Sequence, residues 1–155
     1  MQPATIEDVV PSLMASPESV RELETYMLSM PQVDLETSHL VHGRMYARTI
    51  LIPAGTLLTG AETKCDNICV VVGDITVTTD DGTVRLTGHH VIPARAGFKR
   101  AGIAHADTWW TTLIQTDEAD VSAIERQMTD EVELLQTNRS GIEYQHKPAL
   151  KGEPT

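Results

Sequence analysis

The sequence is poor in aromatic residues and in basic charge. Of its 155 residues, one is Phe, two are Trp and three are Tyr. Any core must therefore be built mainly from Val, Ile, Leu, Met and Ala. Lys and Arg together number 12 against 22 Asp and Glu, which gives a formal net charge of −10. Such a chain repels phosphate backbones, so we expect no nucleic-acid partner and no polybasic membrane patch.

Long apolar runs and a leader pattern are also missing. No apolar run approaches the roughly 20 residues that span a bilayer, so we expect no membrane partner. The chain begins Met1-Gln2-Pro3 and turns acidic, without a basic segment followed by an apolar one. We therefore expect a cytoplasmic location.

Cysteine is scarce, with Cys65 and Cys69 as the two examples. Four positions apart on a strand, they would lie about 13 Å from each other, too far for a disulfide. We expect both thiols to be reduced and packed, in agreement with a cytoplasmic setting.

Charge divides the chain into four parts. Residues 1–37 and residues 117–137 each carry seven acids and one base, whereas residues 38–116 are nearly neutral. We interpret these parts as a helical N-terminal arm, a C-terminal helix and, between them, a β-barrel domain. Residues 138–155 are polar, contain Gly and Pro, and form the fourth part, a tail.

The two acidic flanks have the pattern of amphipathic helices. Ser16-Pro17-Glu18 is typical of a helix start, and Pro31 ends that helix. A shorter helix is predicted over residues 5–10. Acids at residues 117–120 precede a last helix, whose apolar stripe is Val121, Ile124, Met128, Val132 and Leu135.

The centre of the chain predicts seven or eight short strands. Turn residues recur roughly every 8–12 positions, which favours a sandwich or barrel over a parallel sheet. Asp80-Asp81-Gly82 marks a hairpin turn. The adjacent Trp109 and Trp110 should face opposite sides of a strand, one in the core and the other exposed or in an interface. The clearest strands are Met45–Ile52, Ile68–Val72, Ile75–Thr79, Thr83–Leu86 and Trp109–Ile114.

Two segments carry a family resemblance. The first runs from Pro53-Ala-Gly55 through Glu62, Asp66 and Asn67 to Gly73-Asp74, and the second is the stretch from Gly88 to Arg100 with Pro93 and Gly97 inside it. Over residues 38–116 this Gly/Pro framework resembles the cupins. The resemblance implies a mainly β fold, a cupin-type double-sheet jelly roll with flanking N-terminal and C-terminal helices.

Further segments resemble small cupin-like proteins encoded in phage and prophage genomes. That resemblance implies no defined activity. It implies a phage or host protein as a partner and a place in the host cytoplasm or the virion. The matching segments are Met45–Arg48, Ile52–Thr56, Gly73–Val77, Lys99–Gly102 and Asp107–Thr112.

Cupins commonly hold a metal with imidazoles and one carboxylate, and this chain departs from that pattern. The motif-two position falls on Arg100 or Lys99, where a fixed cation opposes a divalent metal. No His occupies a motif-one position in either register, so we expect no metal and no other cofactor. Counted from Gly55 these positions are Ala61, Thr63 and Asn67; counted back from Gly73 they are Gly60, Glu62 and Asp66.

The other candidate site residues are basic, acidic or aromatic. Arg48, Lys64, Lys99 and Arg100 would suit a small anion if they converge at the barrel mouth. The alternative is that they form salt bridges to the nearby acids Glu62, Asp66 and Asp107. Tyr46, Glu62 and Asp66 belong to the same candidate ligand-binding set, and the two carboxylates could bind a hard ion weakly.

His105 and Asp107 form a candidate catalytic pair. Their spacing puts both on one face of a strand, where a carboxylate can orient an imidazole that acts as a general base. The alternative is an ordinary surface pair.

Two functional hypotheses follow from different classes. The first is a phage- or prophage-type cupin-fold protein without the usual His metal site, acting as a homo-oligomeric structural or small-anion-binding component. The second is an enzyme. A metal-free version resembles sugar-nucleotide epimerases, with His105 as base, Asp107 orienting it, and basic residues holding a pyrophosphate. A metal-dependent cupin oxygenase conflicts with Thr63 and Asn67. A third possibility, which the sequence does not separate from the metal-free enzyme, is a regulator or anti-defence protein that sequesters a small signalling nucleotide.

Overall fold

Alternating β-branched residues in the centre of the chain form seven antiparallel strands in one sheet. The computed structural model describes residues 17–79 and 81–135. The expected helix over residues 5–10, the turn residue Asp80 and the polar tail lie outside them. The strands are β1 (Glu36–His42), β2 (Met45–Ile52), β3 (Leu57–Thr59), β4 (Asn67–Thr79), β5 (Gly82–Ala94), β6 (Ala101–Ala104) and β7 (Thr108–Gln115).

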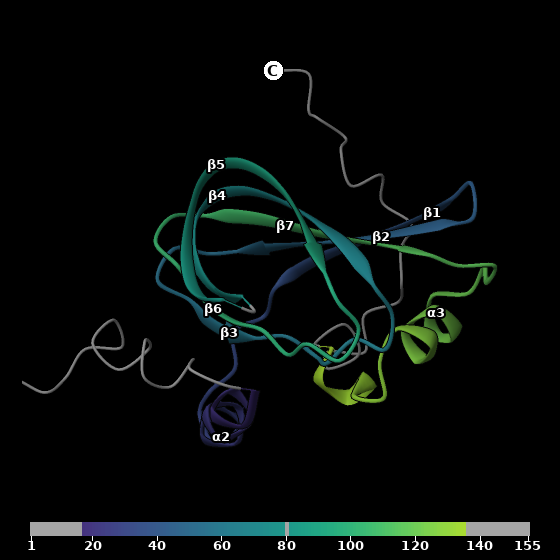
Figure 1. Cartoon of the computed structure of the whole chain (residues 1–155). Helices are drawn as coiled ribbons and strands as arrows, with labels where there is room; N and C mark the ends of the chain where they lie inside the picture. The colour runs from purple at the N-terminus through teal and green to yellow at the C-terminus, as the bar shows by residue number, and fades with distance from the viewer. Residues whose placement is uncertain (1–16, 80, 136–155) are drawn as a thin grey trace, which may run out of the picture.

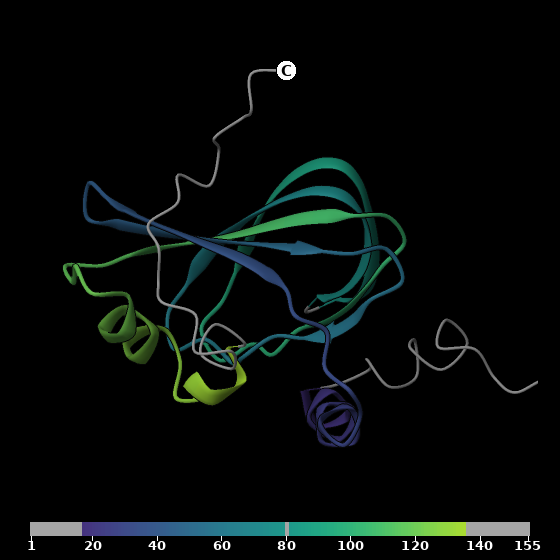
Figure 2. The same cartoon turned by 180° about the vertical axis from the view of Figure 1, so that it is seen from behind.

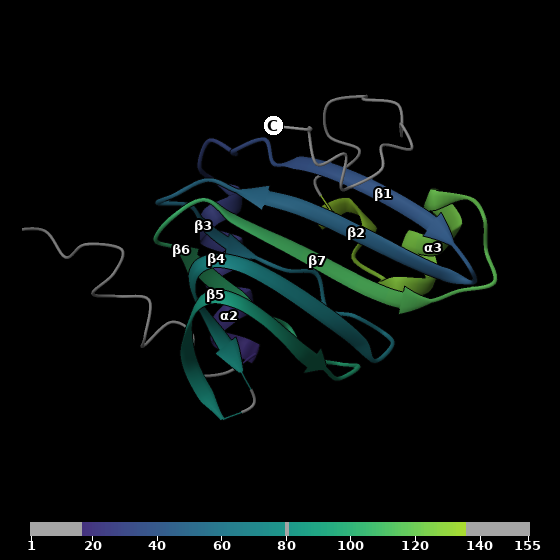
Figure 3. The same cartoon turned by 90° about the horizontal axis from the view of Figure 1, so that it is seen from above.

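The sheet curls into a half-barrel (Figures 1 and 3), with the order β1-β2-β7-β4-β6-β3 and with β5 paired to β4. The expectation of separate strands on the two sides of Gly73 is wrong, because β4 continues through it. Gly73 has a φ of +150°, and a Cβ there would lie 2.7 Å from the Cα of Thr108. β4 pairs with β7 before this glycine and with β6 after it, so the bend turns the sheet around its interior.

The predicted hairpin and the predicted sides of the tryptophans are confirmed. β4 and β5 pair along their length, ending at Thr79 and Gly82. Trp110 is 8% exposed and packs inside the half-barrel, whereas Trp109 is 42% exposed on the outer face. The core inside the curl comes from several strands: Ile50, Ile52, Cys69, Val71, Ile75 and Val77 are all buried there.

Two α-helices lie on the same side of the sheet, at opposite ends of it (Figure 2). Helix α2 (Pro17–Leu28) buries Val20 and Leu23 against Ala101 and Ile103 of β6. Helix α3 (Val121–Met128) begins with Asp120, whose carboxylate accepts a 3.0 Å hydrogen bond from the Ala123 backbone N–H. Among the described residues no helix is long and apolar enough to cross a membrane.

The C-terminal helix ends earlier than its apolar stripe predicts. α3 stops at Met128, and a short 3₁₀ turn, η1 (Val132–Leu134), follows. Thr129 has an extended backbone, and its hydroxyl donates a 2.6 Å hydrogen bond to the Glu62 carbonyl. This tertiary contact interrupts the helix. The stripe residues Ile124, Met128 and Leu135 are nevertheless buried together, against Tyr46 of β2.

The observed architecture agrees with the predicted class. The described residues form a mainly β unit with a curled antiparallel sheet and two flanking α-helices. β1 begins at Glu36, within the stretch that charge alone assigns to the N-terminal arm. Helix α3 and the segment after it contribute Met128 and Leu135 to the wall of the candidate site, whereas α2 packs against β6 in a separate cluster.

Candidate functional site

A cavity of about 130 Å³ lies inside the half-barrel. Its wall is mainly apolar, with Ile50, Ile52, Ile75 and Val77 from the sheet. Met128 and Leu135 of the C-terminal segment also line it. The cavity is therefore lined by the sheet, its connecting segments and the C-terminal end of the described chain.

Two guanidinium groups line this apolar cavity, those of Arg48 and Arg100. The Arg100 guanidinium carbon lies 5.1 Å from the ring centroid of Phe98 and 5.5 Å from that of Trp110. Arg100 also donates a 2.7 Å hydrogen bond to the Thr78 carbonyl. Both arginines remain charged at any ordinary pH, so each places a positive charge in the cavity wall.

The residues that line the cavity show which of the two sets of motif-one positions faces the interior, the set counted from Gly55 or the set counted back from Gly73. Ala61, Thr63 and Asn67 line the cavity, and so does Arg100. Of the alternative positions, Gly60 also lines the cavity, but the two carboxylates do not: Glu62 pairs with Arg21, and the Asp66 carboxylate accepts a 2.9 Å hydrogen bond from the Ala96 N–H.

The inward positions do not fit a transition metal. They offer a methyl group, a hydroxyl, an amide and a fixed cation, rather than imidazoles and a carboxylate. Asn67 instead bonds locally: its amide nitrogen lies 3.4 Å from the Thr63 hydroxyl, and its oxygen accepts from the Cys69 thiol at 3.3 Å. Within residues 17–79 and 81–135, no three metal-ligating side chains converge.

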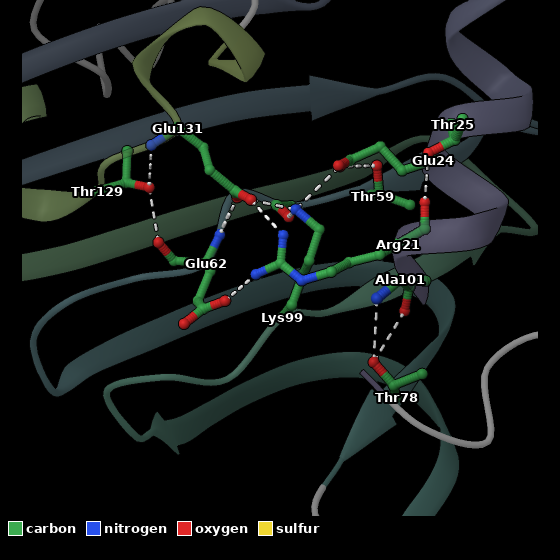
Figure 4. A network of polar contacts seen from close by, with 11 residues as sticks. Arg21, Glu24, Thr25, Thr59, Glu62, Thr78, Lys99, Ala101, Thr129 and Glu131 are labelled. Atoms are coloured by element: carbon green, nitrogen blue, oxygen red, sulfur yellow. Dashed lines mark hydrogen bonds and ion pairs between the residues drawn. The ribbon is translucent and has the colours of Figure 1, made fainter. Parts of the chain in front are cut away.

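Lys99 lies next to Arg100 in sequence and points to a different place, a buried charge cluster shown in Figure 4. Its side chain is fully buried. The ammonium lies 3.0 Å from a Glu24 carboxylate oxygen and 2.9 Å from a Glu131 oxygen, and it donates a 3.0 Å hydrogen bond to the Gly60 carbonyl. Three separated segments therefore meet on one cation.

Glu131 is the second centre of this charge cluster. It also accepts from Arg21 at 2.6 Å and from the Glu62 backbone N–H at 2.8 Å. Burial acts to raise the pKa of Glu131, but these hydrogen bonds and the Lys99 charge hold that pKa at about 2. The carboxylate therefore stays ionised and anchors the chain after α3.

The remaining basic and aromatic candidates lie away from the cavity lining. Lys64 is exposed and pairs with Asp130 at 3.0 Å. Tyr46 is fully buried beneath α3, and its hydroxyl lies 2.6 Å from Nδ1 of His39. Burial and the nearby Arg48 charge lower the pKa of His39 to about 4.

His105 and Asp107 lie in the connection between β6 and β7, so the expectation that they share a strand face is wrong. His105 Nε2 lies 2.7 Å from the Thr76 hydroxyl. The Asp107 carboxylate accepts a 2.9 Å hydrogen bond from the Ala54 N–H. Neither residue is among those lining the cavity.

Several residues of these two sites are absent from the sequence-based candidates. In the sequence, three of them resemble ordinary solvated helix charges: Glu24, Glu131 and Arg21. They are far apart in sequence, so no local pattern indicates that they lie close together in the fold. Thr63 and Asn67 were identified only as positions where ligands are missing. Lys99 and Arg100 lie between β5 and β6, so strand alternation could not have signalled that the two cations diverge.

Comparisons with known proteins give a fold likeness. No protein-family model and no curated protein matches the sequence. A cupin superfamily protein from Desulfitobacterium hafniense is 15% identical and covers 57% of this chain and 83% of its own, with a TM-score of 0.47. KdgF from a Halomonas species is 16% identical, covering 57% and 86%, also with a TM-score of 0.47.

A third solved structure is an RmlC-like cupin family protein with a double-stranded β-helix fold from Methanocaldococcus jannaschii. It is 11% identical and covers 56% of this chain and 85% of its own, with a TM-score of 0.45. None of these three is named as a phage protein, so the phage resemblance rests on the sequence segments alone. The likeness concerns the fold.

Replacing Lys99 by Met should lower the free energy of unfolding by about 3–5 kcal/mol, because two carboxylates then remain buried without their cation. Urea denaturation measures this. Lys64→Met, which removes an exposed ion pair, is the matched control and should cost less than about 1 kcal/mol. Equal losses in the two variants would contradict the role given to the buried cluster.

Acidification should destabilise the protein through His39. The pKa of His39 in the folded protein, about 4, lies below the ordinary value of 6.5. Between these two pH values His39 is protonated in the unfolded chain and neutral in the native state. The free energy of unfolding should therefore fall by up to about 3 kcal/mol as the pH drops from about 7 to 4. His39→Gln should lack this part of the slope; an unchanged slope would show that His39 is not its source.

Proposed function

We propose that this chain is a binding protein whose half-barrel interior takes a small anion. The observation that carries the proposal is the presence of two arginines in the wall of an otherwise apolar cavity, with no Asp or Glu among the described lining residues. A guanidinium in a poorly hydrated setting attracts an anion more strongly than it would in water. Two acids of the flanks, Glu24 and Glu131, are engaged with Lys99.

The enzyme hypothesis receives less support. A base must lie within hydrogen-bonding reach of the proton that it removes. His105 and Asp107 are not among the cavity-lining residues, and Lys99 is held by two carboxylates. The residues proposed for an epimerase-like reaction therefore lie at three separate places.

The protein is also proposed to form a homo-oligomer, through the outer face of β2, β7, β4 and β5. The pairing of these strands places uncharged residues side by side on that face. A chain of net charge −10 repels a second copy over most of its surface, so an uncharged face offers the least electrostatic opposition to contact. Exposed apolar residues on it are Ile68, Val72, Val91 and Trp109.

A panel of anions tests the binding function. At constant ionic strength, at least one small carboxylate or inorganic phosphate should raise the melting temperature, because a ligand at 100 times its Kd adds about 2.7 kcal/mol to native stability. Combined Arg48→Met and Arg100→Met replacements should abolish the shift. Arg44→Met, which removes an exposed cation, should leave it unchanged. If no anion of the panel stabilises the protein, the proposed function is wrong.

A charge on the outer face tests the oligomer. Val91→Glu should convert the protein to a monomer, as measured by size-exclusion chromatography with light scattering, because two buried carboxylates would oppose each other across a symmetric interface. Val84→Glu adds the same charge on β5 near the hairpin end. It should leave the oligomer intact. A monomer in the unaltered protein would refute the interface.

A further inference from the structure

The segment that follows helix α3, residues 129–135, lies against one side of the cavity. Met128, which ends α3, and Leu135, which ends the segment, are both buried and both line the cavity. Figures 1 and 2 show the segment, in yellow, between the two helices on the open side of the curled sheet. A molecule that reaches the cavity from this side must therefore pass it.

Polar contacts hold this segment to the rest of the fold. The Glu131 carboxylate accepts a 2.9 Å hydrogen bond from the Lys99 ammonium and a 2.6 Å hydrogen bond from Arg21. It also accepts a 2.8 Å hydrogen bond from the Glu62 backbone N–H. The Thr129 hydroxyl donates to the Glu62 carbonyl. Much of the attachment therefore depends on a single ionised side chain.

The apolar part of the attachment is small. Leu135 is buried, whereas Val132 and Leu134 of η1 are partly exposed. The sheet is held differently, since β4 pairs with β5 along their whole length. A segment with few buried apolar groups opens at a lower free energy than a strand inside a paired sheet. Local opening of residues 129–135 is therefore favoured over unfolding of the sheet.

The two carboxylates that contact Lys99 hold different elements in place. Glu24, 3.0 Å from the ammonium, belongs to helix α2. None of the residues of α2 lines the cavity, and its buried residues pack against β6. Glu131 belongs to the segment that carries Leu135 into the cavity wall. Loss of the Glu131 contact should therefore uncover the cavity, whereas loss of the Glu24 contact should not.

We propose that residues 129–135 form a lid over the cavity, that the ion pair between Glu131 and Lys99 holds the lid closed, and that small molecules enter when this pair breaks. The inference adds control of access to the proposed function and rests on it for the role of the cavity. The sheet stays folded while the lid opens, because the lid takes no part in strand pairing.

Cys69 provides a reporter of lid opening. Its thiol is buried and lines the cavity. Burial raises the pKa of this thiol, so it should react slowly while the lid is closed, because the thiolate is the reactive form. The uncharged reagent N-ethylmaleimide should reach it when the lid opens or the protein unfolds. In a Cys65→Ser background, mass spectrometry of the intact chain measures the rate of this modification.

At constant pH, Glu131→Ala should raise the rate of Cys69 modification by about 10- to 100-fold, because it leaves the lid without its ionic attachment. Glu24→Ala is the matched control. It removes the other carboxylate from the same ammonium and should leave the rate nearly unchanged. The rate should also be nearly independent of urea at low concentration, since local opening exposes little surface, whereas global unfolding depends steeply on urea.

Two results would overturn the lid. One is a modification rate in the Cys65→Ser protein that rises steeply from the lowest urea concentrations, as expected for global unfolding. The other is an equal increase in Glu131→Ala and Glu24→Ala. If Glu131→Ala does not fold, as judged by circular dichroism, the urea dependence in the Cys65→Ser protein decides the matter.

The outcomes separate the lid from the function beneath it, because N-ethylmaleimide reports access without any bound anion. Stabilisation by an anion together with a steep urea dependence would overturn the lid and leave the proposed function in place. Modification that is independent of urea, with no anion stabilising the protein, would overturn the proposed function and leave the lid as the route to the cavity.

Discussion

The buried ammonium of Lys99 is the constraint on which the arrangement around the cavity depends. It joins Glu24 of helix α2, the backbone before β4, and Glu131 beyond helix α3. A buried ion requires well-placed partners, since its hydration is lost on folding. These partners come from segments far apart in sequence, so satisfying one cation ties both flanks to the segment that joins β3 and β4.

The same charge cluster also holds two acids of the flanks. Glu131 and Glu24 are both held by Lys99, with Arg21 adding a second contact to Glu131. The described cavity lining contains two arginines and no Asp or Glu, which is the basis of the proposed function.

Much of the fold was predictable because it follows from local patterns. Met45–Ile52 forms β2 over the same residues, and the alternation at Trp109 and Trp110 correctly separates exposed from buried. The candidate site was less predictable. Arg100 and Lys99 were both candidates for one pocket, but only Arg100 lines the cavity, because Lys99 is held by carboxylates of distant segments. The apolar stripe that ends at Leu135 correctly predicted which residues are buried. It wrongly predicted a helix that continues to Leu135, because the helix is interrupted at Thr129, whose hydroxyl donates a hydrogen bond to the Glu62 carbonyl.

The sequence by itself determined the mainly β class, the hairpin and the missing imidazoles, because strand periodicity, turn chemistry and side-chain identity are local properties. Tertiary structure decided which motif register faces inward, which cation is buried among carboxylates and where His105 and Asp107 lie. Those outcomes depend on the curl of the sheet at Gly73 and on pairing between distant segments. No local pattern contains that information, since the free energy of burying a charge depends on partners that only the folded chain brings together.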